Sequence, residues 1–421
     1  MRNFPIKVQQ TDQVDMGRLQ INVTSALGAR PIPDARIAIY YTGEPEQQLE
    51  EVTTDSSGQT EELELAAPPL EYSVQPSEPQ PYSEYTMEIT APGYEPVEVI
   101  AAEILPDVTA VQNVKMVPTQ EGQEYERFVI PAHTLFGDYP PKIAEAEIKP
   151  VNETGEIVLS RVVVPEYVIV HDGVPTDSTA TNYWVRYKDY IKNVASSEIY
   201  ATWTDAAIRA NVLAIMSFTL NRVYTEWYRN KGYDFTITSS TAFDHKWING
   251  RNIFENISRI VDEMFGNYLS RPNVKQPILT QYCDGHRVTC PNWLSQWGSQ
   301  ALGEQGYTAI EILRNYYGDT IYINSAEEIS GVPYSFPGYD LTVGASGQKV
   351  LQMQEQLNRI AQNYPAVPRV SEDGIFGPAT ERAVQKFQSI FGLPANGIVD
   401  YPTWYKISEI YVAVSRIAEL V

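Results

Sequence analysis

Residues that hold metals or build disulfide frameworks are scarce in this sequence. The 421 residues include only two cysteines and four histidines. Cys283 and Cys290 enclose His286, and either a short-loop disulfide or a pair of free thiols accounts for them, with a zinc site as a lesser alternative. Zinc needs three or four ligands with good geometry, and few other imidazoles are available: His133, His171 and His245. The sequence therefore predicts no metal centre and no cofactor.

Long apolar runs and an excess of basic residues are also missing. No stretch of about 18 apolar residues occurs, so we expect no membrane-spanning helix. The segment MRNFPIKVQQTDQ lacks an apolar core and a small-residue cleavage site, so no secretory signal is predicted. Acidic residues number 53 and basic residues 31, which gives a formal charge of −22. This charge opposes binding to nucleic acid or to anionic membranes, and acidic surface of this kind mostly serves solubility.

The chain is too long for one ordinary core, so we expect several domains. After a tail of residues 1–16, residues 17–118 alternate polar and apolar positions in short runs such as GRLQINVTS and YTMEITAPGY. Turn clusters such as TDSSGQ separate the runs, which is typical of a small antiparallel β-sandwich. The arrangement resembles prealbumin-like domains, which implies a structural or docking module. An inhibitory prosegment is the alternative.

Residues 119–164 are rich in proline, glutamate and glycine and show few periodic apolar positions. This composition predicts an extended connector, with one added strand within residues 155–164. An accessible backbone of this kind is where a protease cuts most easily.

The central region, residues 165–338, mixes helical and strand patterns. Residues 190–195 are predicted as a brief helix, and Glu198 falls in the polar break that follows it. Next comes a long helix that Thr204 can cap and Asp205 can favour in its first turn. This helix is apolar nearly all round, so its first half should be buried. A carboxyl at the edge of such a helix is partly stripped of water and becomes a better proton donor, as a glycosidic general acid must be.

Four segments follow one another in a recognisable order: V-x-S-S-E-I at 194–199, A-N-V-x-A-x-x-S-F-T-L-N-R at 210–222, ITSSTAFD at 237–244 and LSQWGSQALGEQGYTAIEILRNYYG at 294–318. Together they resemble the SpoIID/LytB-type domain of peptidoglycan lytic transglycosylases. The closer resemblance is to the SleC-type spore cortex-lytic enzymes. It extends from about Val164, through VPEYVIVHDGVPTD, to the end of the sequence.

The resemblance implies a reaction and a catalytic residue. In such enzymes one carboxylic acid protonates the oxygen that links N-acetylmuramic acid to N-acetylglucosamine. The resulting carboxylate then removes the proton of the muramoyl C6 hydroxyl, which closes a 1,6-anhydro ring. A single acid serves both steps, whereas an ordinary glycoside hydrolase requires a pair of carboxyl groups. Glu198 falls on the family's catalytic glutamate, and Asp244 is the best second carboxylate for a hydrolase.

Hydroxyl, amide and aromatic side chains suited to a sugar-binding cleft occur in and between these motifs. We expect the following residues to form one cleft with Glu198: Ser239, Ser240, Thr241, Asp244, Tyr282, Ser295, Gln296 and Trp297. The general SpoIID pattern has a glycine-rich segment with a histidine before SQWG, whereas this chain has CDGHRVTCPNW. The register of His286 against the family histidine therefore stays open.

Residues 340–421 change to a pattern of three helices, in which Pro378 starts the second and Pro402 opens the third. The segments DGIFGPATERAVQKFQ and NGIVDYPTW resemble the repeat of the three-helix peptidoglycan-binding domain. This resemblance implies a groove for glycan and peptide, to which we assign three residues: Asp373, Phe376 and Tyr401.

The expected architecture is a multidomain α+β protein. It has an N-terminal antiparallel β-sandwich, a connector, a central mixed α/β SpoIID-like catalytic domain, and a C-terminal three-helix peptidoglycan-binding domain. The expected partner is peptidoglycan, with no nucleic acid and no membrane insertion.

The resemblance implies a spore cortex lytic transglycosylase that is made as a zymogen, cut by a subtilisin-like protease and active in germination. It also implies synthesis in the mother cell and a place on the cortex or coat side of the spore. Two alternatives are a muramidase that uses Glu198 with a second carboxylate, and a non-catalytic cortex-binding protein. An amidase or endopeptidase is less favoured, because its usual metal triad or cysteine–histidine pair at workable spacing is missing.

Overall fold

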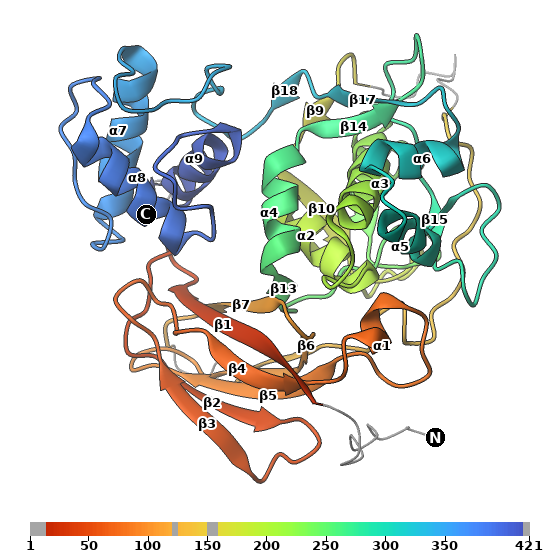
Figure 1. Ribbon diagram of the computed structural model, residues 1–421, viewed down its shortest axis with the longest axis horizontal. Helices are drawn as coiled ribbons and strands as arrows, with labels where there is room; N and C mark the ends of the chain where they lie inside the picture. The colour runs from red at the N-terminus through yellow and green to blue at the C-terminus, as the bar shows by residue number, and fades with distance from the viewer. Residues whose placement is uncertain (1–13, 120–124, 150–158, 416–421) are drawn as a thin grey trace.

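The computed structural model describes residues 14–119, 125–149 and 159–415. Within these ranges the fold is mixed α/β, with several sheets and nine α-helices. Figure 1 shows three parts: two layered sheets at the bottom, a mixed α/β region above them on the right, and a helical domain on the left. Among the described residues, no helix combines the length and the apolar character that crossing a membrane requires.

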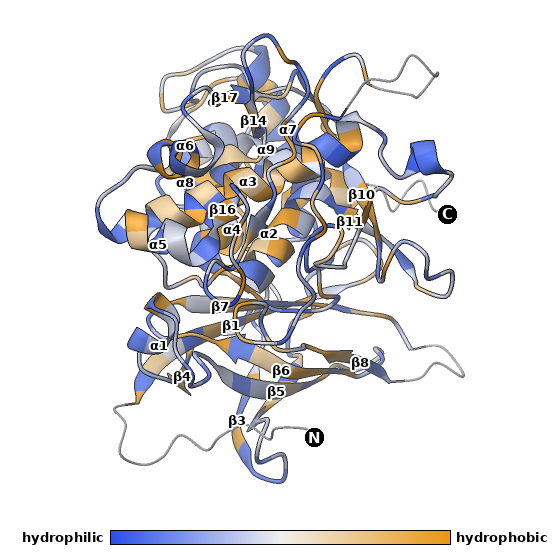
Figure 2. Ribbon diagram, turned by 90° about the vertical axis from the view of Figure 1, so that its right-hand side faces the viewer, coloured by the Kyte–Doolittle hydropathy of each residue, from blue (hydrophilic) through white to orange (hydrophobic). Residues whose placement is uncertain are grey.

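Residues 15–119 and 125–129, here called the sandwich region, form two sheets that lie one above the other (Figure 2). Along β1 nearly every second residue is buried, because successive side chains of a strand point to opposite faces. Most neighbours pair antiparallel, but β1 with β7 and β6 with β8 are parallel, which local alternation cannot predict. The elements are β1 (Asp15–Ser25), β2 (Arg36–Tyr41), β3 (Gln48–Thr53), β4 (Leu63–Ala67), α1 (Glu71–Val74), β5 (Ser83–Thr90), β6 (Val97–Ile104), β7 (Thr109–Met116) and β8 (Glu126–Val129).

The central region adds a strand to one of these sheets. Its β13 (Ile253–Phe254) pairs antiparallel with β7, so that the sheet order is β13-β7-β1-β4. Beside this strand, the buried side chains of Glu103 and Arg251 form an ion pair of 2.7 Å. The side chain of Asn252 bonds to both backbone groups of Glu103, at 3.0 and 2.9 Å. The buried apolar residues of the two regions form one continuous cluster, so the sandwich region and the central region share a core.

Residues 131–149, here called the strap, run along the central region without regular secondary structure. Side-chain amides of the central region pair with the strap backbone. Gln281 bonds to Ile143 and Glu145 at 2.6 and 2.8 Å, and Gln276 bonds to Lys149 at 2.7 and 3.2 Å. This part of the predicted connector is extended, as expected, but it is bound to the central region rather than freely accessible.

The remainder of the connector is described only in part. Residues 150–158 lie outside the described residues. Within the segment predicted to add a strand, β9 (Val163–Val164) pairs with β18 (Glu328–Ile329) of the central region.

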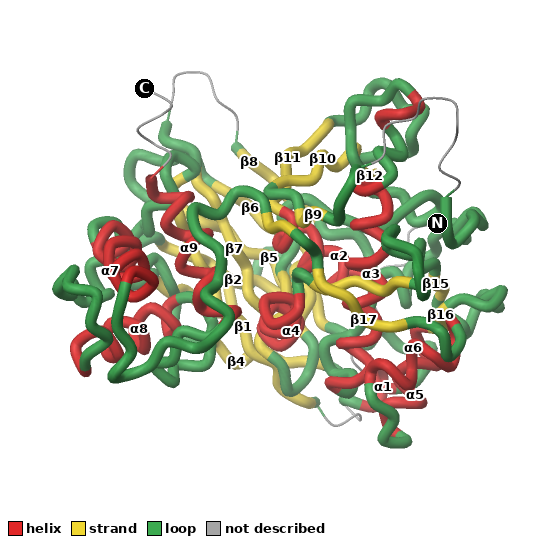
Figure 3. Tube along the Cα trace, turned by 90° about the horizontal axis from the view of Figure 1, so that it is seen from above, coloured by secondary structure: helices red, strands yellow, loops and turns green. Residues whose placement is uncertain are grey.

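The central region is built around α3 (Asp205–Tyr224), which is buried along most of its length. Thr204 caps this helix by accepting a hydrogen bond from the Ala207 N–H at 3.3 Å, so the predicted cap is confirmed. Figures 2 and 3 show further helices of the region packed around α3. The other elements are β10 (Tyr167–His171), β11 (Asn182–Arg186), α2 (Tyr187–Glu198), the short 3-10 helix Arg229–Lys231, β12 (Ile237–Thr238), α4 (Glu255–Met264), β14 (Asn267–Ser270), β15 (Tyr282–Cys283), β16 (Leu294–Ser295), α5 (Gln296–Glu304), α6 (Ala309–Tyr317) and β17 (Tyr322–Ser325).

The C-terminal domain consists of α7 (Gln348–Ala361), α8 (Pro378–Ile390) and α9 (Tyr401–Ser415). The two halves of this domain contain the same hydrogen-bonding motif, in which a glutamine amide binds the backbone of a turn. The Gln354 amide accepts from the Gly374 N–H and donates to a backbone carbonyl one residue further on, at 2.8 and 3.0 Å. The Gln388 amide does the same at Gly397, with both distances 2.8 Å. Both glycines have positive φ angles, +70° and +77°, which favour glycine at these turns.

A buried cluster of charges joins the C-terminal domain to the central region. Lys188 and Lys192 of α2 lie 3.1 and 2.7 Å from Asp262 of α4, and Lys188 also lies 2.5 Å from Glu409 of α9. Lys406 of α9 completes the cluster. Burial would raise the pKa of Asp262, but the lysines outweigh it and hold that pKa well below its usual range. Figure 3 shows α9 on the side of its domain that faces α4.

Candidate functional site

Glu198 is the last residue of α2, and 4% of its surface is exposed. The sequence predicts that the helix ends near residue 195, but the helix continues. The Ser197 hydroxyl donates to the Asn193 carbonyl at 2.8 Å, and the Ile199 N–H donates to the Ala195 carbonyl at 3.0 Å. A serine whose hydroxyl bonds back along the helix does not have to break it. Glu198 therefore lies at the end of a buried helix.

Two groups of the central region hold the Glu198 carboxylate. The Lys246 N–H donates to Oε1 at 2.8 Å. Gln296, the first residue of α5, donates from Nε2 to the Glu198 carbonyl at 2.8 Å and reaches Oε2 at 3.4 Å. Tyr282 is also near: burial and then the charge of Glu198 raise the pKa of its hydroxyl well above the ordinary value. Three of the predicted site residues, Glu198, Gln296 and Tyr282, thus meet in one place.

The strap covers this place. Thr134 donates to the Ser197 carbonyl from both its backbone N–H, at 3.2 Å, and its hydroxyl, at 2.8 Å. Burial and then the charges of Glu103 and Glu198 raise the pKa of Tyr139 to about 12, so this strap phenol also lies close to the carboxylate. In the chain as it stands, Glu198 is enclosed by protein groups.

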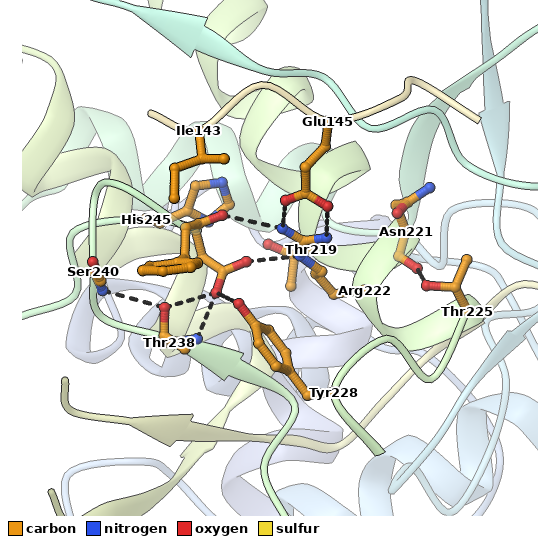
Figure 4. A network of polar contacts seen from close by, with 12 residues as sticks. Ile143, Glu145, Thr219, Asn221, Arg222, Thr225, Tyr228, Thr238, Ser240 and His245 are labelled. Carbon is orange, nitrogen blue, oxygen red and sulfur yellow. Dashed lines mark hydrogen bonds and ion pairs between the residues drawn. The ribbon is translucent and has the colours of Figure 1, made fainter. Parts of the chain in front are cut away.

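Asp244, the predicted second carboxylate, is wholly buried in a separate network. Figure 4 labels three of its partners: Arg222, Tyr228 and Thr238. Its Oδ1 accepts from Arg222 at 2.7 Å, and its Oδ2 accepts from the Tyr228 hydroxyl at 2.6 Å. The Thr238 N–H and hydroxyl add bonds of 2.9 and 2.7 Å. With both oxygens engaged, this carboxylate orders the ITSSTAFD loop and presents no free oxygen to a substrate.

Glu145 of the strap joins the same network. It forms a two-pronged ion pair with Arg222, at 2.5 and 3.1 Å (Figure 4). Burial would raise the pKa of Glu145, but hydrogen bonds and charge from Arg222 and Lys149 outweigh it and bring that pKa to about 2.

The hydroxyl residues predicted for the cleft are engaged as well. The Ser239 hydroxyl donates to Asp172 at 2.7 Å. The Ser240 N–H reaches the Thr238 hydroxyl at 3.4 Å, and its carbonyl accepts from the following turn. The Thr241 hydroxyl donates to the Pro140 carbonyl of the strap at 3.2 Å. Of these residues, Thr241 is the one in direct contact with the strap.

Cys283 and Cys290 form a disulfide, which decides among the alternatives that the sequence left open. Within the described ranges, no group of three or more histidine, cysteine, aspartate or glutamate side chains is arranged to hold a metal. In the disulfide loop, Asp284 accepts from the His286 N–H at 3.2 Å and from Arg287 Nε at 2.8 Å. Arg287 also donates to three backbone carbonyls of the strap: Thr134 at 2.7 Å, Phe136 at 3.4 Å and Gly137 at 2.6 Å. These bonds attach the disulfide loop to the strap.

A pocket of about 240 Å³ lies between the disulfide loop, the strap and the sandwich region. Aromatic rings line it: Trp297 and Tyr200 of the central region, Phe136 of the strap and Tyr72 of the sandwich region. Trp297 follows Gln296 in α5, and its ring packs 5.8 Å from that of Tyr200. Ser295, by contrast, serves as the N-cap of α5 and accepts from the Gly298 N–H at 2.9 Å.

The three residues assigned to a C-terminal groove lie in different surroundings. Asp373 shapes a turn by accepting from the Ile375 N–H at 2.9 Å. Phe376 is 0% exposed, so its ring belongs to the core of the domain and cannot line a surface groove. Tyr401 packs 5.5 Å from the ring of Phe265, which places it at the junction with the central region. The groove assignment is therefore wrong for Phe376, because its ring closes the helical core, and it stays a prediction for Asp373 and Tyr401.

The C-terminal domain matches a known family. Residues 346–407 match the family model described as putative peptidoglycan binding domain. The predicted peptidoglycan-binding domain is thereby confirmed.

Relatives and solved structures match parts of the chain. The zinc D-Ala-D-Ala carboxypeptidase of Streptomyces albus G is 44% identical over 78 residues, which is 18% of this chain and 29% of that protein. The uncharacterized protein in the bpoA1 3' region of Kitasatospora aureofaciens is 46% identical over 63 residues, 15% of this chain and 49% of that protein. A crystal structure of the SleB N-terminal domain matches 18% of this chain and 99% of that domain at 30% identity, with a TM-score of 0.16.

These matches have a limited reach. The chain spans less than half the length of either curated relative, and the TM-score supports no argument about the fold. What is shown is a domain in the C-terminal part of the chain that matches the peptidoglycan-binding family.

Proposed function

We propose that the chain is the precursor of a spore cortex lytic transglycosylase, in which Glu198 is the catalytic acid and base. The observation that carries the proposal is the Glu198 carboxylate. It lies at the end of a buried helix, is held by the Lys246 N–H and the Gln296 amide, and has Tyr282 beside it. The motif resemblance of residues 194–199 supports the same residue. A peptidoglycan-binding domain in the same chain supports peptidoglycan as the substrate.

The proposed reaction needs one carboxyl group only. Protonated Glu198 gives its proton to the oxygen between N-acetylmuramic acid and N-acetylglucosamine. The muramoyl C6 hydroxyl then attacks the sugar carbon and passes its proton to the carboxylate, which restores the acid and leaves a 1,6-anhydro end. Gln296 would hold the carboxyl in one orientation through both steps. The engagement of both Asp244 oxygens disfavours a muramidase, because that enzyme requires a second carboxylate that can activate water.

The strap supports the precursor part of the proposal. Substrate cannot reach Glu198 while Thr134 and its neighbours lie across the end of α2. A subtilisin-like protease that cuts on either side of the strap would let it leave. The aromatic pocket at Trp297 and Tyr200 would then be continuous with the site and offer rings on which sugars stack.

The test is a digest of spore cortex peptidoglycan by protein cut within the connector, with wild type compared to Glu198→Gln. The variant keeps the shape of the side chain and removes the titrating group. We expect release of soluble fragments to fall by at least about 100-fold, the usual scale for a general acid. Mass spectrometry of the wild-type products should show ends that lack one water relative to hydrolysed ends.

Other outcomes identify the alternatives. Hydrolysed ends would identify a muramidase. No release by the wild type in any cut form, with binding to cortex intact, would identify a non-catalytic cortex-binding protein. In every case we expect Glu198→Gln to pellet with cortex as the wild type does, because residues 346–407 are unchanged. Full activity of Glu198→Gln would refute the proposal.

A further inference from the structure

The side chain of Lys142 enters the central region from the strap. Its ammonium donates to the Thr241 carbonyl at 3.3 Å and to the Asp244 carbonyl. Burial lowers the pKa of Lys142, and Glu198 is the strongest of the charges that oppose this effect. The ammonium is therefore held beside the proposed catalytic carboxylate by backbone oxygens. No ion pair within 4.0 Å joins Lys142 to a carboxylate in the described part of the chain.

Aromatic rings form the rest of its surroundings. The ammonium lies 5.4 Å from the centre of the Phe218 ring and 4.8 Å from that of Tyr282. The faces of such rings are negative and attract cations. The His245 ring packs against both, with centroids 4.4 and 5.8 Å away. Burial, then Lys142 and Arg222, hold the pKa of His245 well below its usual range, so this imidazole is neutral.

One buried polar atom here, Nε2 of His245, lacks a hydrogen-bond partner among the described residues. The Tyr282 hydroxyl, by contrast, lies beside the Glu198 carboxylate, which can accept its hydrogen bond. Buried polar groups are normally bonded, so this imidazole nitrogen is open to a polar group of a ligand. A ligand with both a cationic centre and a polar substituent can take the place of the ammonium and bond to this nitrogen.

We propose that the Thr241 and Asp244 carbonyls, with the rings of Phe218, Tyr282 and His245, form a cation-binding subsite next to Glu198, and that Lys142 is its internal occupant. The external ligands of this subsite are organic cations with polar substituents, of which a sugar ring carrying positive charge is one. The link to a sugar rests on the proposed function, because an oxocarbenium-like ring develops its charge beside the catalytic acid. The subsite itself rests on geometry alone. While the strap is in place, Lys142 excludes any such ligand.

The experiment is a rescue measured on the full, uncut chain. Lys142→Ala removes the part of the side chain beyond Cβ, and n-propylammonium is that missing part. We expect Lys142→Ala to unfold at a lower temperature than wild type and to regain about 2–4 °C when n-propylammonium saturates it, by mass action on the folded state. The neutral probe 1-propanol, of the same size, should give no such gain. Wild type should respond to neither probe, because its subsite is filled.

Lys142→Met is the matched control, since it fills the same space without a charge. It should unfold below wild type and gain nothing from n-propylammonium. Equal gains of Lys142→Ala with the ammonium and the alcohol would show an apolar cavity and overturn the proposal, as would no gain at all in a folded Lys142→Ala. Should Lys142→Ala fail to fold, wild type cut within the strap takes its place. A rise of its unfolding temperature with n-propylammonium but not with 1-propanol supports the proposal, and the absence of that rise refutes it. None of these readouts requires cortex digestion, so an inactive protein would refute the enzyme assignment and leave the subsite standing.

Discussion

Breaking the ion pair between Glu103 and Arg251 from one side should strongly destabilise the protein. The two side chains are 1% and 0% exposed and lie 2.7 Å apart. Arg251 also donates to the Ser197 hydroxyl at 3.0 Å and to the Asn252 carbonyl at 2.8 Å. In Glu103→Met these bonds remain, but the guanidinium loses its counter-charge in a site that water does not reach. Leaving a buried charge unpaired costs about 3–5 kcal/mol.

Removing both partners should cost far less. Burial raises the pKa of Glu103 even though Arg251 lowers it by charge and by hydrogen bonding. The free-energy cost of desolvating the carboxylate therefore exceeds the favourable interaction with Arg251, and the ion pair contributes little net stability. A double variant, Glu103→Met with Arg251→Met, fills similar space with apolar atoms and should unfold near the wild type, within about 1 kcal/mol.

Urea unfolding of the full chain, followed by tryptophan fluorescence, measures these differences. With a slope of about 3 kcal/mol per M, each single variant should lower the midpoint by about 1–2 M, and the double variant by far less. Because the pair bridges the sandwich region and the central region, both should unfold in the same transition. Single variants that lose under about 1 kcal/mol, or a double variant as unstable as the singles, would refute the reasoning.

Two further predictions concern the strap and the C-terminal domain. The pKa of Glu145 is lowered from 4.5 to about 2, so its ion pair contributes stability above pH 4.5 that is lost as the pH falls toward 2. In Glu145→Gln, the free energy of unfolding should change less across this window, which urea titrations at several pH values can check against wild type. Gln354→Leu leaves a buried glycine N–H unpaired and should cost about 1–3 kcal/mol. Gln388→Leu should cost nearly the same, because the two halves contain the same hydrogen-bonding motif, and a clearly unequal loss in thermal unfolding would contradict that equivalence.

Local patterns were enough to predict several elements of the fold. Thr204 has the cap chemistry that starts α3, and Pro378 is the first residue of α8. Gly318, at φ +85°, ends α6 where the pattern predicted. In each case the signal lies within a few residues of the feature it determines.

Features that depend on distant partners could not be predicted in this way. The extension of α2 to Glu198 depends on hydroxyl bonds that no propensity reveals. Asp244 is a carboxylate within a predicted site motif, yet both of its oxygens accept hydrogen bonds, from Arg222 and from Tyr228. Lys142 lies about a hundred residues from its acceptors, and nothing in its own segment distinguishes it from a solvated lysine. The roles of these side chains follow from tertiary contacts alone.

The bonds that hold the strap differ in kind from those that hold the sandwich region. The sandwich region is joined to the central region by a shared sheet, a continuous apolar core and a buried ion pair. It also touches the C-terminal domain, where Tyr364 donates to the Ala29 carbonyl at 3.0 Å and Gln59 donates to the Ile390 carbonyl at 2.6 Å. The strap has no strand pairing. Apart from the ion pair of Glu145 with Arg222 and the buried Leu135, single hydrogen bonds from polar side chains such as Arg287 and Gln281 hold it.

The single hydrogen bonds contribute on the order of 1 kcal/mol each, and those at Arg287 and Gln281 can open one after another. Because the strap is connected to the chain at both ends, its groups stay close to their partners and bind again after a contact opens. A cut at one end lowers this effective concentration for the groups nearest the cut. A cut does not weaken the apolar core between the sandwich region and the central region in this way, because the contacts of that core are lost together or not at all. We therefore expect a single cut beside the strap to free the strap, with Thr134 and Lys142, before it frees the sandwich region, and the strap is the part of the chain that covers Glu198.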